Sequence, residues 1–336
     1  MPSTVVMFPG QLAKVVPLHK AGIVDPERRI RGLINGWERT LRRDFLAMVT
    51  RIKNTQNLET IANLLEFGRV TEAVELMRPH VAQFTGQINN AFQGSAQGTQ
   101  GFLLDNNIVV SFNATHPRAV DIMANRQLRF TNGFMQQQEQ ATRQALTRGV
   151  HQGLGPREQA RLFRDSVGLT PRQEQYIANY RQQLETLDRG ALDRALRDGR
   201  FDRTVRNRIA NNRPLTGKQV DKMVDRYRDR WVKYRSEVIA RSESLSAVHQ
   251  GNKEMYDQAI ESGELANEQL EKTWHTAKDG RQRESHDAMD GDTVAHDELF
   301  QSGLGNQLDY PGDPGAPEED TAQCRCAVTT RIKGEA

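Results

Sequence analysis

Apolar residues in the N-terminal part recur at steps of three and four, the spacing of one stripe along an amphipathic helix. The clearest example runs from Ile30 to Ile52, and a shorter one runs from Leu58 to Leu65. The spacing returns from Val70 to Phe92, where Pro79 is expected to kink the helix. Residues 27–92 are therefore predicted to form a helical N-terminal region.

Two neighbouring stretches lack this periodicity. Residues 1–26 contain four prolines and no regular apolar pattern, which indicates an irregular N-terminal arm. Residues 93–101 are small and polar, and such a composition neither packs a core nor holds a helix well. We therefore predict a flexible linker over residues 93–107.

Helical spacing dominates again in residues 108–251, which we predict to be a central helical domain. The β-branched run at residues 108–112 is typical of a short strand. A long helix then extends to about Gln152, and two further helices begin at prolines. The last and longest helix is expected from about Thr216 through Gly251.

After Trp274 the pattern changes, and Gly, Asp and Pro separate short apolar pieces. This indicates a C-terminal module over residues 252–336 with many loops and a few short strands. Hydrophobic residues make up 37% of the chain and the mean hydropathy is −0.71, which favours extended helices with a large solvated surface. The predicted fold is mainly α, with elongated helical N-terminal and central regions and a small α+β, loop-rich C-terminal module.

The net charge of +3 conceals a strong segregation of charge along the chain. Residues 188–241 contain sixteen Lys and Arg against eight Asp and Glu, whereas residues 252–323 contain five against eighteen. Basic side chains bind DNA phosphates without regard to sequence, although a solvated helix face is an equal alternative. The candidate DNA contacts are Arg226, Arg228, Arg230, Lys233 and Arg235.

The compartment follows from what the sequence lacks. The N-terminus has no basic start followed by an apolar run, and no stretch approaches the roughly 20 apolar residues of a membrane span. The two cysteines, Cys324 and Cys326, are too close for an unstrained mutual disulfide and suit a reducing compartment. We expect a soluble protein made in a cytoplasm.

A series of motifs follows in fixed order through the last hundred or so residues. Its members are Arg241, Glu243, Trp274, Asp279, Arg283, His286, Asp290, Gly291, Phe300, Tyr310, Pro311, Gly312, Asp313, Cys324 and Cys326. The order resembles the phage Mu F-like head morphogenesis family, whose members show an Ala-Arg-Thr-Glu-Thr helix, a Trp/Asp/Arg/His/Asp-Gly block and a terminal Asn-Cys-Arg-Cys. The resemblance covers roughly residues 112–328 and departs from the pattern at Ser242, Ser244 and Gln323.

The resemblance implies a phage minor head protein. Such a protein enters the procapsid in few copies, associates with the portal or the inner capsid, and affects assembly and genome packaging or ejection. Its implied partners are the portal protein and the major capsid or scaffold protein, with packaged double-stranded DNA as a further candidate and no membrane. Its implied place is the virion, in the head interior or at the portal vertex, after assembly in the host cytoplasm.

The motif residues also allow local chemistry to be predicted. His286, Cys324 and Cys326 are expected to converge, either as zinc ligands or as buried reduced thiols packed beneath Trp274. His275, His296 or Asp279 are candidates for a fourth zinc ligand, and in the packing version His286 bonds to Asp279 or Asp290. Arg241 and Glu243 are expected to anchor the C-terminal loops, and the Asp290 and Asp313 carboxylates to accept hydrogen bonds from turn backbone.

Two other functions remain as alternatives to a head protein. A phage-borne nuclease or metal-dependent hydrolase would use His275, Asp279, Arg283, Glu284 and His286 as acid, base and phosphate clamp. No phosphate-binding loop, nucleophile elbow or His-Glu-x-x-His motif accompanies them, so we do not expect an enzyme. The second alternative is a non-specific DNA-binding protein of the head interior.

Overall fold

The computed structural model describes residues 25–333 and is mainly α, as the sequence predicts. The helices are α1 (Pro26–Thr55), α2 (Leu58–Glu66), α3 (Val70–Glu75), α4 (Arg78–Asp105), α5 (Pro117–His151), α6 (Pro156–Ser166), α7 (Pro171–Glu185), α8 (Asp202–Ala210), α9 (Gly217–Glu261), α10 (Glu284–Asp287) and α11 (Glu318–Thr321). Short 3-10 turns occur at η1 (Arg189–Asp193), η2 (Gly199–Phe201) and η3 (Asn267–Gln269). The strands are β1 (Leu270–His275), β2 (Thr293–Ala295), β3 (Phe300–Gln301), β4 (Gln307–Leu308) and β5 (Ala327–Ile332). The predicted N-terminal arm lies outside the described residues up to residue 24.

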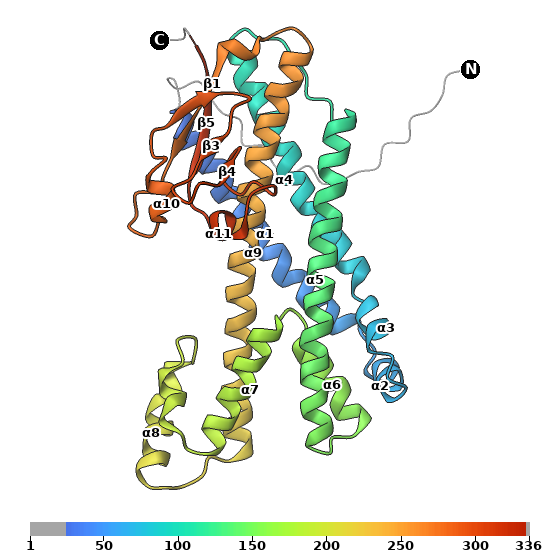
Figure 1. Ribbon diagram of the computed structural model, residues 1–336. Coiled ribbons are helices and arrows are strands. Elements are labelled where there is room, and N and C mark those ends of the chain that lie inside the picture. Colours follow the sequence, from blue (N-terminus) through green and yellow to red (C-terminus); the bar gives the residue numbers. More distant parts are fainter. Residues whose placement is uncertain (1–24, 334–336) are drawn as a thin grey trace, which may run out of the picture.

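Helix α9 is the longest element and the axis of the molecule. Its 45 residues correspond to about 68 Å, and α1 and α4 pack along it (Figure 1). Helix α5 packs against α4, α6 and α7, and α6 and α7 lie in the lower part of the helical body in Figure 1. The Thr216 side chain accepts a hydrogen bond from the backbone of Gln219, and the Gln219 side chain caps in return, so the start of α9 is fixed by its own sequence.

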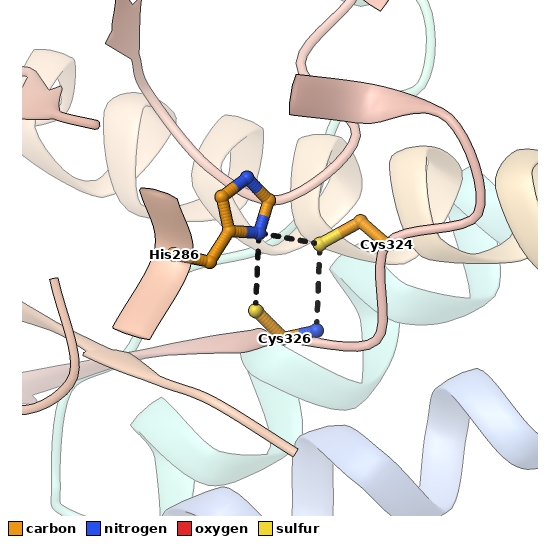
Figure 2. Close-up of side chains that lie close together, drawn as sticks. All are labelled: His286, Cys324 and Cys326. Atoms are coloured by element: carbon orange, nitrogen blue, oxygen red, sulfur yellow. Dashed lines mark hydrogen bonds between the residues drawn. The ribbon is translucent and has the colours of Figure 1, made fainter. Parts of the chain in front are cut away.

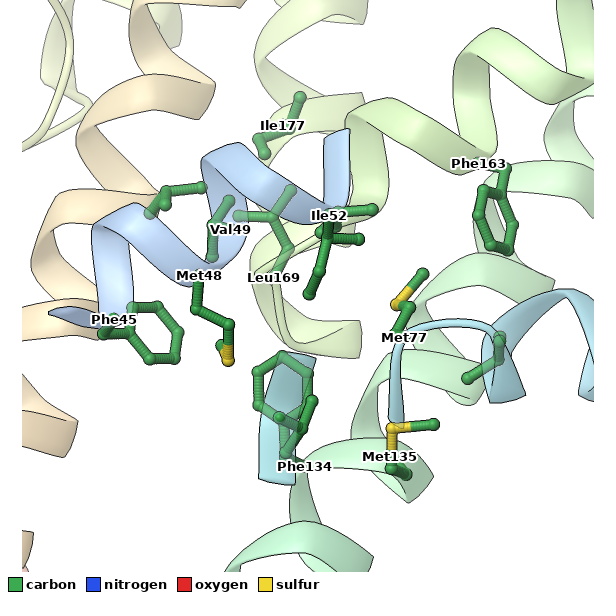
Figure 3. Packing of buried hydrophobic residues seen from close by; sticks show 14 of the residues in the cluster. Phe45, Met48, Val49, Ile52, Met77, Phe134, Met135, Phe163, Leu169 and Ile177 are labelled. Carbon is green, nitrogen blue, oxygen red and sulfur yellow. The ribbon is translucent and has the colours of Figure 1, made fainter. Parts of the chain in front are cut away.

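One large apolar core joins the two regions that the sequence suggested were separate. Phe45, Met48 and Ile52 of α1 lie close to Phe134 of α5 and Ile177 of α7 (Figure 3). The ring of Phe45 contacts that of Phe134 edge-on, with centroids 6.1 Å apart. Residues 27–92 and the helices of residues 108–251 therefore share a core, and the predicted boundary between them is not a boundary of packing.

The predicted flexible linker is wrong, because residues 93–101 continue α4 as regular helix. Small side chains let α4 lie directly on α9. Ser95 donates a hydrogen bond to the carbonyl oxygen of Val248 at 2.7 Å, and Thr99 donates to the Asn252 side chain at 2.5 Å. A Cβ added to Gly251 would lie 2.1 Å from the carbonyl oxygen of Phe92. The composition that suggested a linker is therefore that of a close helix–helix contact.

Two smaller expectations also fail. Pro79 stands in the first turn of α4 and begins that helix instead of kinking a continuous one, since its missing N–H costs nothing there. Residues 108–112 form no strand, although the backbone runs from α4 to α5 with its polar groups satisfied by side chains. The backbone N–H of Phe112 donates to Gln100 at 3.0 Å, and that of Asn113 donates to Gln258 at 2.8 Å.

The C-terminal module consists of a three-stranded antiparallel sheet in the order β2-β1-β5 and the two-stranded β3-β4 hairpin. In β1, Trp274 pairs with Val328 of β5, and the strand pattern alternates buried and half-buried residues. The core of the module includes Ile30 and Ile34 of α1 together with Leu245 and Val248 of α9. The module is thus built onto the upper half of the α1/α9 pair (Figure 1). Within residues 25–333 no helix is both long enough and apolar enough to cross a membrane.

Replacing Gly251 tests the α4–α9 contact. We expect Gly251→Ala to lower the free energy of unfolding by about 1–3 kcal/mol, because the new methyl group forces two helix backbones apart. Gly32→Ala is the matched control: Gly32 lies inside α1, is exposed and has no atom within 4 Å of an added Cβ. That substitution should be neutral or stabilise by up to about 1 kcal/mol. Urea unfolding followed by circular dichroism measures both, and equal losses would contradict the contact.

Candidate metal centre

His286, Cys324 and Cys326 converge in the C-terminal module, as the sequence predicts (Figure 2). The Nδ1 atom of His286 lies 3.4 Å from the Sγ atom of Cys324 and 3.4 Å from that of Cys326. The three side chains are 1–2% exposed. Residues separated by some forty positions thus form one closed cluster of the two ligand types that zinc prefers.

Three elements bring these side chains together. His286 lies on the single turn of α10, Cys326 directly precedes β5, and Cys324 lies between α11 and that strand. The backbone N–H of Cys326 donates to the Cys324 sulfur at 3.4 Å, which fixes the short Cys-Arg-Cys segment. The ring of Trp274 covers the cluster, edge-on to the His286 ring with centroids 5.4 Å apart.

The other ring nitrogen of His286 faces a carboxylate that sequence reasoning did not single out. Nε2 lies 3.3 Å from Oδ1 of Asp320, which is fully buried. Asp320 accepts hydrogen bonds from Ser285 at 3.1 Å, Ser302 at 2.8 Å and Asn306 at 2.9 Å. Burial alone would raise the pKa of the Asp320 carboxyl, but these hydrogen bonds outweigh it and lower the pKa below its ordinary value.

The two thiols influence each other strongly. Their mutual hydrogen bond lowers the pKa of Cys324 well below its ordinary value and raises the pKa of Cys326, so one thiolate forms more readily than two. A thiolate beside an imidazole can bind a soft cation or act as a nucleophile. Burial of both sulfur atoms removes them from any substrate in solution, which leaves cation binding or packing as the chemistry of this cluster.

The residues predicted as a fourth ligand lie elsewhere. His275 bonds through Nε2 to the Thr329 hydroxyl at 2.9 Å, and His296 bonds to Asp257 at 2.8 Å. Asp279 lies 3.2 Å from Arg325. Among residues 25–333, only His286 and the two cysteines form a group with metal-ligand spacing. The predicted contact of His286 with Asp279 or Asp290 is likewise replaced by the contact with Asp320.

The turn residues of the motif series shape the loops around this cluster. Asp290 accepts a hydrogen bond from the backbone of Thr276 at 2.8 Å, and Asp313 accepts from the backbone of Asp309 at 3.0 Å and of Gly315 at 2.8 Å. The Thr276 hydrogen bond lowers the pKa of Asp290. Both carboxylates therefore close turns, the role their Asp-Gly and Pro-Gly-Asp contexts indicate.

The aromatic and glycine positions of the series place these turns against the rest of the protein. Phe300 and Trp274 form an edge-on pair with centroids 5.2 Å apart, and Tyr310 stacks on His249 of α9. Pro311 is buried next to it. Gly291 has φ 88° and donates to the carbonyl oxygen of Trp274 at 2.8 Å. Gly312 has φ 78°, and a Cβ there would lie 3.2 Å from the backbone nitrogen of Ser246 in α9.

Arg241 and Glu243 do not anchor the C-terminal loops, contrary to expectation. Arg241 donates to Glu38 of α1 at 2.8 Å, and Glu243 lies 3.8 Å from the buried guanidinium of Arg126 in α5. The two residues point away from the loops because α9 lies between α1 and α5 at this level, so each side chain finds an opposite charge on a neighbouring helix. Their contacts tie the helical body together.

The residues of the nuclease alternative are not gathered into one site. Arg283 donates to the carbonyl oxygen of Ala322, Glu284 begins α10, and His286 is closed off in the sulfur cluster. His275 and Asp279 have the separate partners given above. Among the described residues, the side chains of these five form no hydrogen bond or ion pair with one another.

Only part of the predicted DNA-contact set is available at the surface. Arg235 is 5% exposed, donates to Gln137 at 2.8 Å and lies over the Phe134 ring, so its proposed contact with DNA is wrong. Its burial follows from the helical period, which turns it toward α5. Arg228 is paired with Asp225, and Arg230 donates to backbone carbonyl oxygens near η2.

Arg226 and Lys233 are the two exposed members of the set. Both lie in the first half of α9, whereas the C-terminal module packs on Leu245 and Val248 in its second half. The sequence signal that would have separated them from Arg235 is their position off the apolar stripe that continues through Tyr227.

The residues around the cluster that sequence reasoning missed are Asp320 and its hydrogen-bond donors. Asp320 closes the acidic run Glu318-Glu319-Asp320, which is more typical of a solvated turn. Its spacing of four residues from Cys324 was the available signal, because the single turn of α11 brings it under the cysteine loop.

A long helical body thus carries a compact, loop-rich module that is closed around buried cysteine and histidine. Residues 203–329, from α8 to β5, match the family model described as phage Mu protein F like protein. The resemblance predicted from the motif series is confirmed over these residues. No curated protein and no solved structure matches the chain significantly.

The departure from the family pattern at Gln323 has a structural consequence that can be measured. Gln323 has φ 54°, a left-handed conformation that asparagine tolerates better than glutamine. We expect Gln323→Gly to raise the free energy of unfolding by roughly 0.5–1 kcal/mol, after allowance for the greater freedom of glycine in the unfolded chain. Gln323→Ala keeps the Cβ atom and should give no such gain. Thermal unfolding of the three proteins decides, and equal stability of the Gly and Ala variants would contradict strain at this position.

Proposed function

We propose that this protein is a phage minor head protein that enters the procapsid in few copies and associates with the portal or the inner capsid surface. The observation that carries the proposal is the family match over residues 203–329, which includes α9 and the C-terminal module. In this proposal the protein affects assembly and the packaging or ejection of the genome, and it resides in the head interior or at the portal vertex.

The structural role is favoured over catalysis by how the motif residues are used. Asp290 and Asp313 close turns, and Arg283 donates to a backbone carbonyl oxygen. Arg241 and Glu243 hold neighbouring helices. These contacts occupy the polar groups that a hydrolase would need to direct at a substrate, so the motif series supports a binding scaffold.

The β3–β4 hairpin is the part of the family module that we propose as the docking surface. Leu299 is 45% exposed and Leu304 is 57% exposed, on a module whose other large apolar residues are mostly buried. Leu299 also lines a surface groove with Val294 and Phe300. Exposed leucines next to a preformed groove suit a protein partner, which in a head is the portal or a capsid protein.

Mass spectrometry of purified proheads and virions tests the first part of the proposal. We expect the protein in both particles at a copy number far below that of the major capsid protein. Leu299→Ser combined with Leu304→Ser should reduce its incorporation, because the substitutions remove apolar area from the docking surface. Leu128→Ser is the matched control, since Leu128 is 59% exposed on α5, outside the module.

Two results would overturn this proposal. The first is the absence of the protein from both proheads and virions. The second is incorporation of the Leu299→Ser, Leu304→Ser double variant at the same level as the Leu128→Ser control. Far-ultraviolet circular dichroism of the purified variants establishes that they are folded. A co-purification experiment with a portal ring identifies which of the two partners is bound.

Contact with packaged DNA is a second candidate function, supported by the exposed Arg226 and Lys233 on the half of the molecule opposite the acidic module. The contact would be weak and independent of sequence, because a few phosphate interactions supply charge neutralisation without base readout.

Salt dependence tests this second function. Arg226→Glu with Lys233→Glu should weaken binding to duplex DNA and flatten its dependence on salt, by roughly 0.9 log units per log unit of salt for each phosphate contact removed. Lys278→Glu with Arg281→Glu makes the same change in net charge at exposed sites of the C-terminal module, away from the first half of α9. If both double variants weaken binding equally, or neither does, the proposed contact is wrong.

A further inference from the structure

We propose that His286, Cys324 and Cys326 supply three of the four ligands of one zinc ion. The inference concerns a resident structural metal and is independent of where the protein acts. It stands on the geometry of the cluster, on the use of the second ring nitrogen of His286, and on the composition of the module around it.

The distances are those of a zinc site. With Zn–S of about 2.3 Å and Zn–N of about 2.0–2.1 Å, tetrahedral angles place a ligand nitrogen about 3.6 Å from each ligand sulfur. The two Nδ1–Sγ distances are both 3.4 Å. Both nitrogen–sulfur distances are therefore within a few tenths of an ångström of those in a tetrahedral zinc site.

Hydrogen bonding alone accounts less well for this arrangement. A neutral imidazole nitrogen offers either one proton or one lone pair in the ring plane, so Nδ1 can make one good hydrogen bond. Here the same Nδ1 has two sulfur atoms at equal distance (Figure 2). A metal ion satisfies both sulfur atoms and the nitrogen at once, because each then bonds to the ion and not to another ligand.

Asp320 prepares His286 for this role. Its carboxylate lies 3.3 Å from Nε2, which favours a proton on that nitrogen and leaves the lone pair of Nδ1 facing the sulfur atoms. Metal-bound histidines commonly have such a carboxylate behind them. Hydrogen bonds from Ser285 and Ser302 hold Asp320 in place, so the orientation of the imidazole is set before an ion arrives.

A metal ion that links these segments would stabilise the surrounding module. Its strands have two to six residues, and α10 and α11 have four each, so local hydrogen bonding fixes little of the chain. Ordering each residue costs backbone entropy, and zinc binding contributes directly to folding in small modules of this kind. Sulfur and imidazole ligands favour zinc over magnesium or calcium.

Metal analysis of the full-length chain tests the proposal. The protein is purified in reducing buffer without chelators. We expect elemental mass spectrometry to find one zinc ion per chain. Replacement by Co(II) should give a sulfur-to-cobalt charge-transfer band together with the visible bands of a tetrahedral site. X-ray absorption at the zinc edge should show two sulfur neighbours at about 2.3 Å and light atoms at about 2.0–2.1 Å.

Substitutions distinguish the proposed zinc ligands from residues that only lie near the site. Cys324→Ser and Cys326→Ser should lose the zinc and the cobalt charge-transfer band. Asp320→Asn keeps all three ligands and should weaken zinc binding by roughly 10–100-fold in a chelator competition. His275→Gln is the matched control, because His275 lies in β1 of the same module and bonds to Thr329, and its zinc content should equal that of the unaltered chain.

A chain that holds no zinc as purified, and that shows no charge-transfer band when titrated with Co(II) under reducing conditions, overturns the proposal. The unaltered chain gives this answer even if a cysteine variant fails to fold. Cys324→Ser would then loosen the module to the same extent with and without a chelator, as expected for a packed thiol–imidazole cluster.

Discussion

At Gly251 the backbones of α4 and α9 come into direct contact, and this contact fixes where the two helices lie relative to each other. At this point the carbonyl oxygen of Phe92 occupies the space that any side chain at residue 251 would need. Two hydrogen bonds within one turn, from Ser95 to Val248 and from Thr99 to Asn252, hold the helices at that spacing. Small residues on both helices thus fix the position of α9 along its axis and its rotation about that axis, relative to α4. The position of α9 in turn determines where the elements that pack on it lie.

The position of the C-terminal module is determined by its packing on α9. Leu245 and Val248 of α9 lie in the same core as Trp274 and both cysteines, and Gly312 brings a loop against the α9 backbone. The motif that begins on α9 and the motifs in the loops are therefore parts of one packing unit, although they are far apart in sequence. The family match likewise covers α9 and the module without a break.

Long helices and their ends could be predicted from the sequence, because apolar periodicity and residues such as Thr216 act locally. The α4–α9 contact could not, since a helix face made of Ser, Thr and Gly has the composition of a linker until its partner is known. The meeting of His286 with the cysteines could be predicted from residue chemistry. The role of Asp320 could not, because its burial depends on hydrogen bonds from Ser285 and Ser302, which the chain brings together only on folding. For the same reason the sequence did not show that Arg235 is buried, because it packs over Phe134 of α5.

In both halves of the molecule, the charge exposed at the surface differs from the charge counted along the sequence. Within the acidic module, Asp320 is buried, Asp290 and Asp313 bond to backbone, and Asp309 is paired with the buried Lys272. In the basic segment, pairing and burial likewise remove several arginines from the surface. Counts taken along the chain therefore overstate the field that a partner meets outside the protein. Steering of a partner falls off within about a Debye length, so only charges that remain exposed contribute to it, and the internally paired ones contribute to the fold instead.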